Sequence, residues 1–336
     1  MIAFIIRRLL AAVLLLLVVG FVTFIIFFWV PKLAGQNSYA LASQFVGKDA
    51  TQATVRAIEK KYGFDKPVIV QYWRFMKNLV TGTKYDAGPV KTTCNFPCFG
   101  VSFKSQTPVW PLIKDRIPVT MSLAIGAAVI WLVSGVIAGV ISAVKRGKFI
   151  DRAVMAVALA GVSAPIFFTG LVALSLFSYK WPLFPNIHYV SILDNPFLWF
   201  GNLVLPWVTL ALLYGALYAR LMRAGMLETL NEDYIRTARA KGLPERTVIA
   251  KHAVRAALTP ILTIFGLDLG LLVGGAILTE YTFSLPGVGQ FAKQAIDNND
   301  LPEIFGVTLV AAFFVIMANL VVDILYAVID PRVRLS

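Results

Sequence analysis

The stretch IPVTMSLAIGAAVIWLVSGVIAGVISAV, residues 117–144, contains no charged side chain. A helix needs about 20 apolar residues to cross the roughly 30 Å hydrocarbon core of a bilayer, and this stretch is longer than that. It also lacks the apolar and polar alternation that is typical of strands in a membrane barrel. We therefore interpret it as a transmembrane helix.

Five further stretches have the same character. The chain has 336 residues, of which 58% are hydrophobic and 15% charged, whereas soluble domains are nearer half apolar and a quarter charged. The sequence thus predicts an all-α polytopic membrane protein with six transmembrane helices, in residues 9–30, 117–144, 153–179, 197–219, 256–279 and 304–329. A kink is expected at Ala164-Pro165, because proline removes a backbone hydrogen bond.

The first apolar run could be a signal peptide, since Arg7 and Arg8 precede it. Its length exceeds the roughly 7–15 residues of a cleaved segment, which favours an uncleaved anchor. Basic residues cluster in the segments that begin at Lys145, Arg220 and Arg332, as well as at the N-terminus. By the positive-inside rule these segments are cytoplasmic, so both termini are expected inside the cell.

Three parts are expected along the chain. They are an N-terminal anchor helix (1–30), an extracytoplasmic segment (31–116) and a transmembrane domain (117–330). Residues 50–62 and 67–79 of the middle part look helical, and apolar residues at three-to-four spacing in the second run predict one face that packs onto the membrane helices. Although the net charge is +13, no compact basic domain is evident, so nucleic-acid binding is disfavoured.

Cys94 and Cys98 lie in the predicted extracytoplasmic segment. Oxidising surroundings permit a disulfide between them, and the alternatives are two unpaired thiols or half of a metal site. The second alternative is weak because the chain has only two histidines, His188 and His252, neither of them near these cysteines in sequence.

Residues of two kinds stand out inside the predicted spans. Gly266, Gly270 and Gly274, with Gly275 beside the last, place small residues at every fourth position. This spacing lets helix backbones approach closely, either within the chain or between two chains. The acidic residues Asp268 and Asp323 have either a pairing role or a pathway role, because charges in a membrane are costly.

The stretch between the fourth and fifth predicted spans, residues 228–255, is too patterned to be a simple connector. Gly242 suits the end of one short helix, and Pro244 suits the first turn of another. An apolar ridge of Ile235, Ala238 and Leu243 beside basic residues could seat in a groove on another protein.

The run DYIRTARAKGL (233–243), followed by HAVR (252–255), resembles the "EAA" loop of permeases in binding-protein-dependent ABC importers. More narrowly, the chain is similar to the B-type permease of the dipeptide and oligopeptide branch. Further matching phrases include YGFDKP (62–67), LTE (278–280), LPGVG (285–289) and DPR (330–332). Arg236 replaces the glutamate of "EAA", and HAVR replaces the final "I-x-L-P", as is typical of that branch.

This resemblance implies the type I ABC importer permease fold, in the prokaryotic cytoplasmic membrane. It also implies three kinds of partner: a second, homologous permease, two ATP-binding subunits that carry ATP and Mg²⁺, and an extracytoplasmic substrate-binding protein. The residues that it assigns to coupling are Arg236, Thr237, Ala238, Arg239, Ala240, Lys241 and Gly242. Glu280 is expected at the outer mouth, as a gate or a contact for the binding protein.

The sequence has no G-x-x-x-x-G-K-[ST] loop and no catalytic constellation, so neither ATP hydrolysis nor another enzymatic activity is expected of this chain. Peptides are the expected substrate. Nickel chelates, glutathione or haem are alternatives within the same importer class. A stand-alone channel or secondary transporter is disfavoured, because such a protein has no use for a docking helix.

Overall fold

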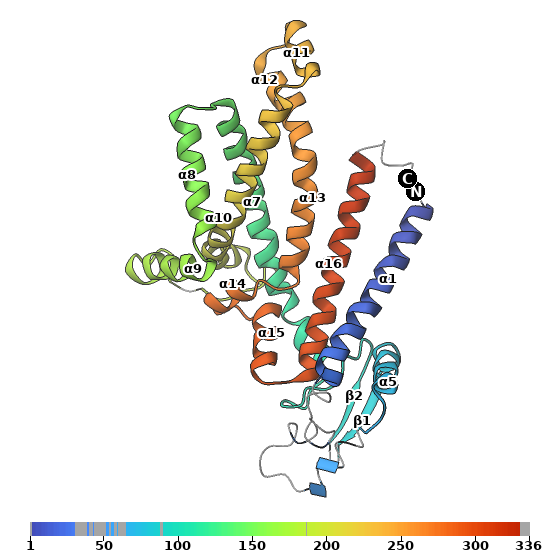
Figure 1. Cartoon of the computed structure of the whole chain (residues 1–336). Helices are drawn as coiled ribbons and strands as arrows, with labels where there is room; N and C mark the ends of the chain where they lie inside the picture. The colour runs from blue at the N-terminus through green and yellow to red at the C-terminus, as the bar shows by residue number, and fades with distance from the viewer. Residues whose placement is uncertain are drawn as a thin grey trace. The chain divides into compact units, whose positions relative to one another are not determined.

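The computed structural model describes residues 2–30, 65–87, 90–185 and 187–329, with seven isolated positions between 39 and 59. Of the predicted helix at 50–62 only residues 52, 53, 55, 56 and 59 are described, all of them helical, and the C-terminal DPR phrase lies outside the described residues. The chain divides into two compact units, residues 1–117 with 291–313 and residues 118–290 with 314–336. Figure 1 shows the elements in chain order.

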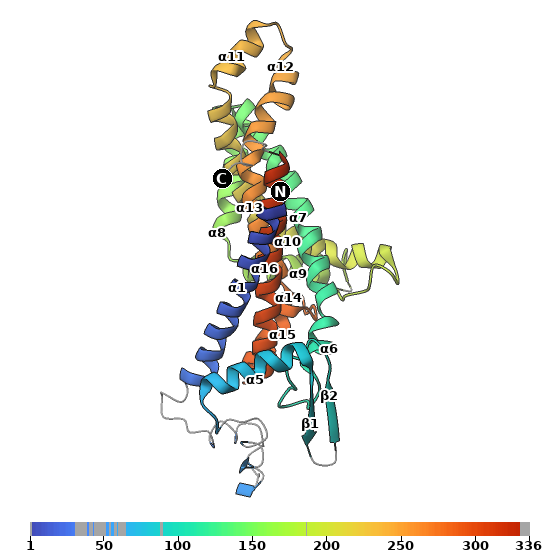
Figure 2. The same cartoon turned by 90° about the vertical axis from the view of Figure 1, so that its right-hand side faces the viewer.

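The first unit contains α1 (Ile2–Phe24), which continues as the π-helical turn η1 (Ile25–Trp29). Next come α5 (Val68–Thr81), the antiparallel strands β1 (Thr83–Ala87) and β2 (Val90–Cys94), and α6 (Val109–Lys114). The helix predicted at 67–79 is confirmed as α5. Figure 2 shows that α5 begins beside the end of α1.

Aromatic side chains attach α5 to its neighbours in the first unit. The Tyr72 ring packs edge-on against Phe21 and Phe24 of α1, and its hydroxyl donates to the Leu17 carbonyl oxygen at 3.0 Å. Phe75 packs against Phe305 with ring centroids 4.4 Å apart. The predicted apolar face of α5 therefore covers other helices of the same unit.

A disulfide joins Cys94 at the end of β2 to Cys98. The loop that follows is held by Asp300, which is 1% exposed. Its Oδ2 accepts hydrogen bonds from the Ser102 hydroxyl (2.7 Å) and the Phe103 amide (2.8 Å), and its Oδ1 accepts from the Glu303 amide (3.3 Å). Asp300 thus caps the start of α16 (Leu301–Ile329) and anchors the loop at the same time.

The second unit is built on four long elements, α7 (Ile117–Val144), α8 (Phe149–Ser163), α10 (Pro196–Thr229) and α13 (Val254–Val273). Close packing of α7 on α10 depends on glycine. A Cβ atom at Gly139 would lie 2.5 Å from the Cβ of Met222, and one at Gly135 would lie 2.7 Å from the Cβ of Tyr218. Small residues bring the two backbones together, as is usual for helices in lipid.

The third predicted span is broken. α8 ends at Ser163, Pro165 precedes α9 (Ile166–Leu174), and the two helical segments differ in direction by 100°. The segment continues as the π-helical turn η2 (Ser175–Lys180), and Figure 1 shows α9 leaving the line of α8 almost sideways. The predicted position of the bend, at Ala164-Pro165, is confirmed. The prediction of a single kinked helix was wrong, because two separate helices meet there at 100°.

Five helices of the described residues are long and apolar enough to cross a membrane, and there are six if the bent α8–α9 pair is one span. The shorter elements α14 (Ile277–Thr282) and α15 (Val288–Asp297) follow α13. α15 lies where the sequence predicts the connection between the last two spans. α14 begins inside the predicted fifth span (256–279), because α13 ends earlier than predicted, at Val273.

Candidate functional site

The short helix α11 (Asp233–Ala240) lies in the segment predicted to couple to another protein. It ends in a Schellman motif, in which the Leu243 amide donates to the Ala238 carbonyl oxygen (3.3 Å) and the Gly242 amide donates to the Arg239 carbonyl oxygen (2.9 Å). Gly242 has φ +75°, a left-handed conformation that favours glycine. The predicted helix end at Gly242 is confirmed.

The chain then begins a new helix directly after Pro244, with α12 (Glu245–Thr247), the π-helical turn η3 (Val248–Ala253) and α13 in succession. These three elements form one continuous helical run from Glu245 to Val273. The second short helix of the prediction is therefore the beginning of a membrane-spanning helix. A movement of α11 can reach α13 through a single rigid connection.

We expected the apolar ridge of Ile235, Ala238 and Leu243 to face another protein, and for the first two residues this prediction was wrong. Ile235 is fully buried and Ala238 is 7% exposed, and both belong to a core cluster with Val248 of η3. Only Leu243 of the ridge is exposed. The ridge therefore fastens α11 to its own chain, because helical spacing places residues 235 and 238 on one face.

The other predicted coupling residues lie on the outer face of α11 and in the turn that follows it, and all are exposed: Arg236, Thr237, Arg239, Ala240, Lys241 and Gly242. The Arg239 guanidinium makes a bidentate ion pair with Glu245, at 2.7 and 3.1 Å, which ties α11 to the start of α12. Both views show α11 and α12 projecting beyond the ends of α10 and α13 (Figures 1 and 2). This exposed helix and turn is accessible to another protein.

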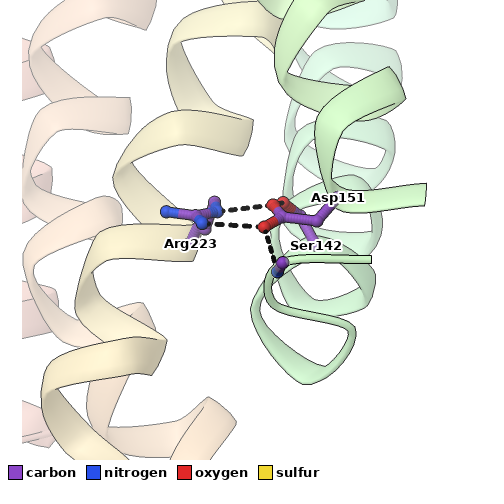
Figure 3. Close-up of polar contacts among 4 residues, drawn as sticks. Ser142, Asp151 and Arg223 are labelled. Carbon is purple, nitrogen blue, oxygen red and sulfur yellow. Dashed lines mark hydrogen bonds and ion pairs between the residues drawn. The ribbon is translucent and has the colours of Figure 1, made fainter. Parts of the chain in front are cut away.

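An ion pair near the same end of the unit was not predicted. The Asp151 carboxylate, at the start of α8, accepts two hydrogen bonds from Arg223 of α10, at 2.7 and 2.9 Å. It also accepts from the Ser142 hydroxyl of α7 and from the Gly147 amide, so it joins three helices (Figure 3). Asp151 is 4% exposed, and we call these four residues the α7–α8–α10 clasp.

Sequence reasoning treated the basic segment that begins at Lys145, with Arg146, Lys148 and Arg152, only as a sign of orientation. The one acidic residue among these cations, Asp151, was a signal that could have been read as a partner. Which arginine it binds could not have been read, since Arg223 is 72 positions away.

Glu280, the predicted outer gate, is fully buried. Its Oε1 accepts from the Thr120 hydroxyl (2.7 Å), and its Oε2 accepts from the Gln290 amide (2.8 Å). Gly287 has no room for a side chain, since a Cβ there would lie 2.3 Å from the Glu280 carboxyl carbon. Burial raises the pKa of this carboxyl above its ordinary value, and the hydrogen bonds oppose that effect.

This arrangement gives the LPGVG phrase a structural explanation. The Val288 amide donates to the Thr120 hydroxyl at 2.8 Å, so the loop, Thr120 and Glu280 form one network. In this conformation Glu280 holds a loop together, and its gating role stays a prediction.

Two of the three predicted interface glycines, Gly266 and Gly270, are buried. A Cβ at Gly270 would lie 2.7 Å from the Cβ of Ala318 in α16, so this glycine allows a close contact within the chain. Gly274 is at the end of α13. Of the two readings of this stretch, the contact of Gly270 favours intramolecular packing at that position.

Asp268 accepts a hydrogen bond from the Tyr218 hydroxyl of α10, at 2.8 Å. Tyr218 packs beside Trp131, whose ring stacks on Tyr214 with centroids 4.8 Å apart. Trp131 lies at the midpoint of α7, so this polar group lies deep in the unit. The side chain of Asp323 lies outside the described residues.

The fold and these sites define a helical, multi-pass membrane protein with an exposed helix at one end of its helix bundle. Two family models match the chain: "Binding-protein-dependent transport system inner membrane component" over residues 135–335, and the N-terminal component of the same system over residues 1–124. The chain therefore belongs to the family of binding-protein-dependent transport system inner membrane components.

Curated relatives agree with this membership. A putative peptide transport system permease protein of Brucella abortus (strain 2308) is 39% identical over 334 residues, which cover 99% of each chain. The dipeptide transport system permease protein DppB of Escherichia coli (strain K12) is 38% identical over 295 residues, which cover 81% of this chain and 83% of the relative.

A solved structure, the MetNI methionine ABC transporter in inward-facing conformations, has a similar fold. The TM-score is 0.53 at 19% sequence identity, over 65% of this chain and 96% of that one. This similarity supports the type I permease fold.

Proposed function

We propose that the chain is the transmembrane permease subunit of an ATP-driven, binding-protein-dependent importer of dipeptides and oligopeptides. The family membership and the names of the peptide permease relatives support this function. The observation that carries the coupling role is the exposed face of α11, fixed by the Schellman motif at Gly242 and by the Arg239–Glu245 ion pair.

Energy reaches this chain by contact with two ATP-binding subunits, which hold the ATP and Mg²⁺. When these subunits close, they move α11, and the movement passes directly into the run from Glu245 to Val273. The α7–α8–α10 clasp transmits the same movement to α7 and α8. Rigid-body rocking of this kind is the general route by which helices alternate between inward-open and outward-open states.

The proposed topology has six spans, with the α8–α9 pair as one broken span and both termini in the cytoplasm. A discontinuous helix is acceptable in a membrane where it lies against protein or lines a cavity. The proposed location is the inner membrane, where residues 31–116 meet the substrate-binding protein and residues 117–330 form half of the pathway. A second, homologous permease forms the other half, with the partly exposed Gly274 as a candidate contact.

The test is gentle purification of the tagged chain, followed by mass spectrometry of every protein and small molecule that comes with it. We expect a sister permease, two ATP-binding subunits and a binding protein loaded with peptides. If the binding protein carries nickel chelate, glutathione or haem, the proposed importer class stands and the proposed substrate is wrong. If the purified chain alone transports solute in liposomes without ATP, the proposal is wrong.

A further inference from the structure

We propose that Asp268 and the aromatic residues around it form a subsite for the protonated amino group of the substrate, halfway along the translocation pathway. This inference rests on the proposed function, and it adds the chemical group that the pathway recognises. Its evidence is an intramembrane carboxylate, its one neutral partner and the rings beside it.

Asp268 is the only charged residue between positions 256 and 273 of α13. A carboxylate within a membrane span is costly unless it is paired or functional. Among the described residues its recorded hydrogen-bond partner is the Tyr218 hydroxyl, which is neutral and bonds to Oδ2. A structural ion pair is therefore absent from the described part of this chain, in contrast to Asp151, which has Arg223.

Three helices converge on this carboxylate. Trp131 comes from α7, and Tyr214 and Tyr218 are one turn apart on α10. Phe265, one turn before Asp268 on α13, packs against Trp131 with centroids 5.9 Å apart. Trp131 and Tyr218 are fully buried, whereas Tyr214, Phe265 and Asp268 each keep part of their surface exposed.

Trp131 contributes the face of its ring to this cluster and not its indole N–H. An indole N–H and an ammonium group are both hydrogen-bond donors, so the two cannot pair with each other.

The chemistry of the cluster fits an ammonium group. A carboxylate attracts the positive charge, and the faces of aromatic rings attract it further. Tyr218 holds Oδ2 and so leaves Oδ1 for the ligand. Binding sites of transporters commonly lie near the membrane midplane, and Trp131 lies at the midpoint of α7. Every peptide with a free N-terminus carries such a group at neutral pH.

The experiment measures uptake by the complete complex in proteoliposomes with saturating, peptide-loaded binding protein. The variants are Asp268→Asn, Asp268→Glu and Tyr218→Phe, with exposed Asp194→Asn as the matched control. Losing a charge-assisted contact should lower uptake of a free-amine dipeptide about tenfold in D268N. D268E should keep most uptake because it keeps the carboxylate, and D194N should match the unsubstituted complex.

A des-amino analogue, whose binding to the binding protein is measured first, serves as the second substrate. The proposal expects D268N to leave its uptake unchanged. The proposal is overturned if D268N loses uptake of both substrates equally, or if it loses uptake of neither. It is also overturned if D268N fails to assemble with the other subunits, because that result would point to an ion pair between Asp268 and a cation on the sister permease. If the unsubstituted complex moves no peptide, the proposed function itself has failed, which is a separate result.

A location measurement does not depend on uptake. The two native cysteines are bonded to each other, so a cysteine placed at Ile264, one turn before Asp268 on α13, is the only free thiol of this chain and leaves the carboxylate in place. Peptide and ATP should slow its reaction with a cationic thiol reagent, whereas Leu212→Cys, in the groove between α8 and α10, should react at an unchanged rate. Equal protection at both positions, or none at Ile264, would place the substrate elsewhere.

Discussion

At the residue scale, Gly242 is the position at which backbone conformation has the clearest consequence. Its φ is +75°, and a Cβ atom built there would contact nothing within 4 Å. The cost of a substitution is therefore backbone strain alone, about 1–2 kcal/mol for most residues. We expect Gly242→Val to lower peptide uptake per ATP hydrolysed by up to about tenfold, because a frayed turn moves α11 less rigidly.

The control for this prediction is Gly201→Val. Gly201 lies in α10 with equally open surroundings and without a left-handed φ, so a valine there adds the same side chain without that backbone strain. Gly242→Asn should retain most coupling, since asparagine tolerates the left-handed region. Equal uptake per ATP in G242V and the unsubstituted complex would show that the Schellman motif has no part in coupling.

Glu280 gives a prediction about pH at the same scale. Because burial raises the pKa of its carboxyl in the folded chain, the folded state holds this proton more tightly than the unfolded state does. Stability from this group is therefore complete below the ordinary glutamate pKa and declines as pH rises through the raised value. We expect the melting temperature to fall as pH rises from about 4.5 towards neutrality.

Glu280→Gln should remove this pH dependence. The melting temperature of the variant should be lower at every pH. The glutamine NH2 group is a donor, and it faces the Gln290 amide, which now donates to the carboxylate. The readout is thus the slope of melting temperature against pH and not its level. A variant with the same slope as the unsubstituted chain would contradict the assignment to Glu280.

At the scale of elements, the α7–α8–α10 clasp predicts coupling between helices. Asp151→Asn should lower the melting temperature and the uptake rate, because the Arg223 guanidinium loses a bidentate partner. The double variant Asp151→Asn with Arg223→Met should be more stable than D151N alone, since no cation is left without its partner. Additive losses in this double-mutant cycle would show that the two residues act independently.

Elements also show where sequence reasoning stops. Apolar length located α7, α10 and α13, and glycine chemistry located the end of α11, because both depend on residues close together in the chain. The 100° turn at Pro165 was predicted only as a kink, since hydropathy is the same for a straight and a broken helix. The partners of Glu280 and Asp151 are 160 and 72 positions away, so no local pattern reveals them.

At the scale of the whole molecule, the proposed coupling role requires that the α8–α9 pair crosses the membrane. Six spans place the 181–195 loop outside and return α11 to the cytoplasm, on the same side as the α7–α8 turn. If the pair does not cross, the loop is cytoplasmic and α11 is extracytoplasmic, where no ATP-binding subunit could reach it. The coupling function and the span count therefore stand or fall together.

Single cysteines at Leu193, which is 91% exposed, and at Lys241 in the turn after α11 distinguish these topologies. The disulfide between Cys94 and Cys98 keeps the native cysteines from reacting. A membrane-impermeant maleimide should label L193C in intact cells and K241C only after permeabilisation. Because each topology predicts the opposite pattern at both positions, labelled K241C and unlabelled L193C in intact cells would exclude α11 as the coupling helix.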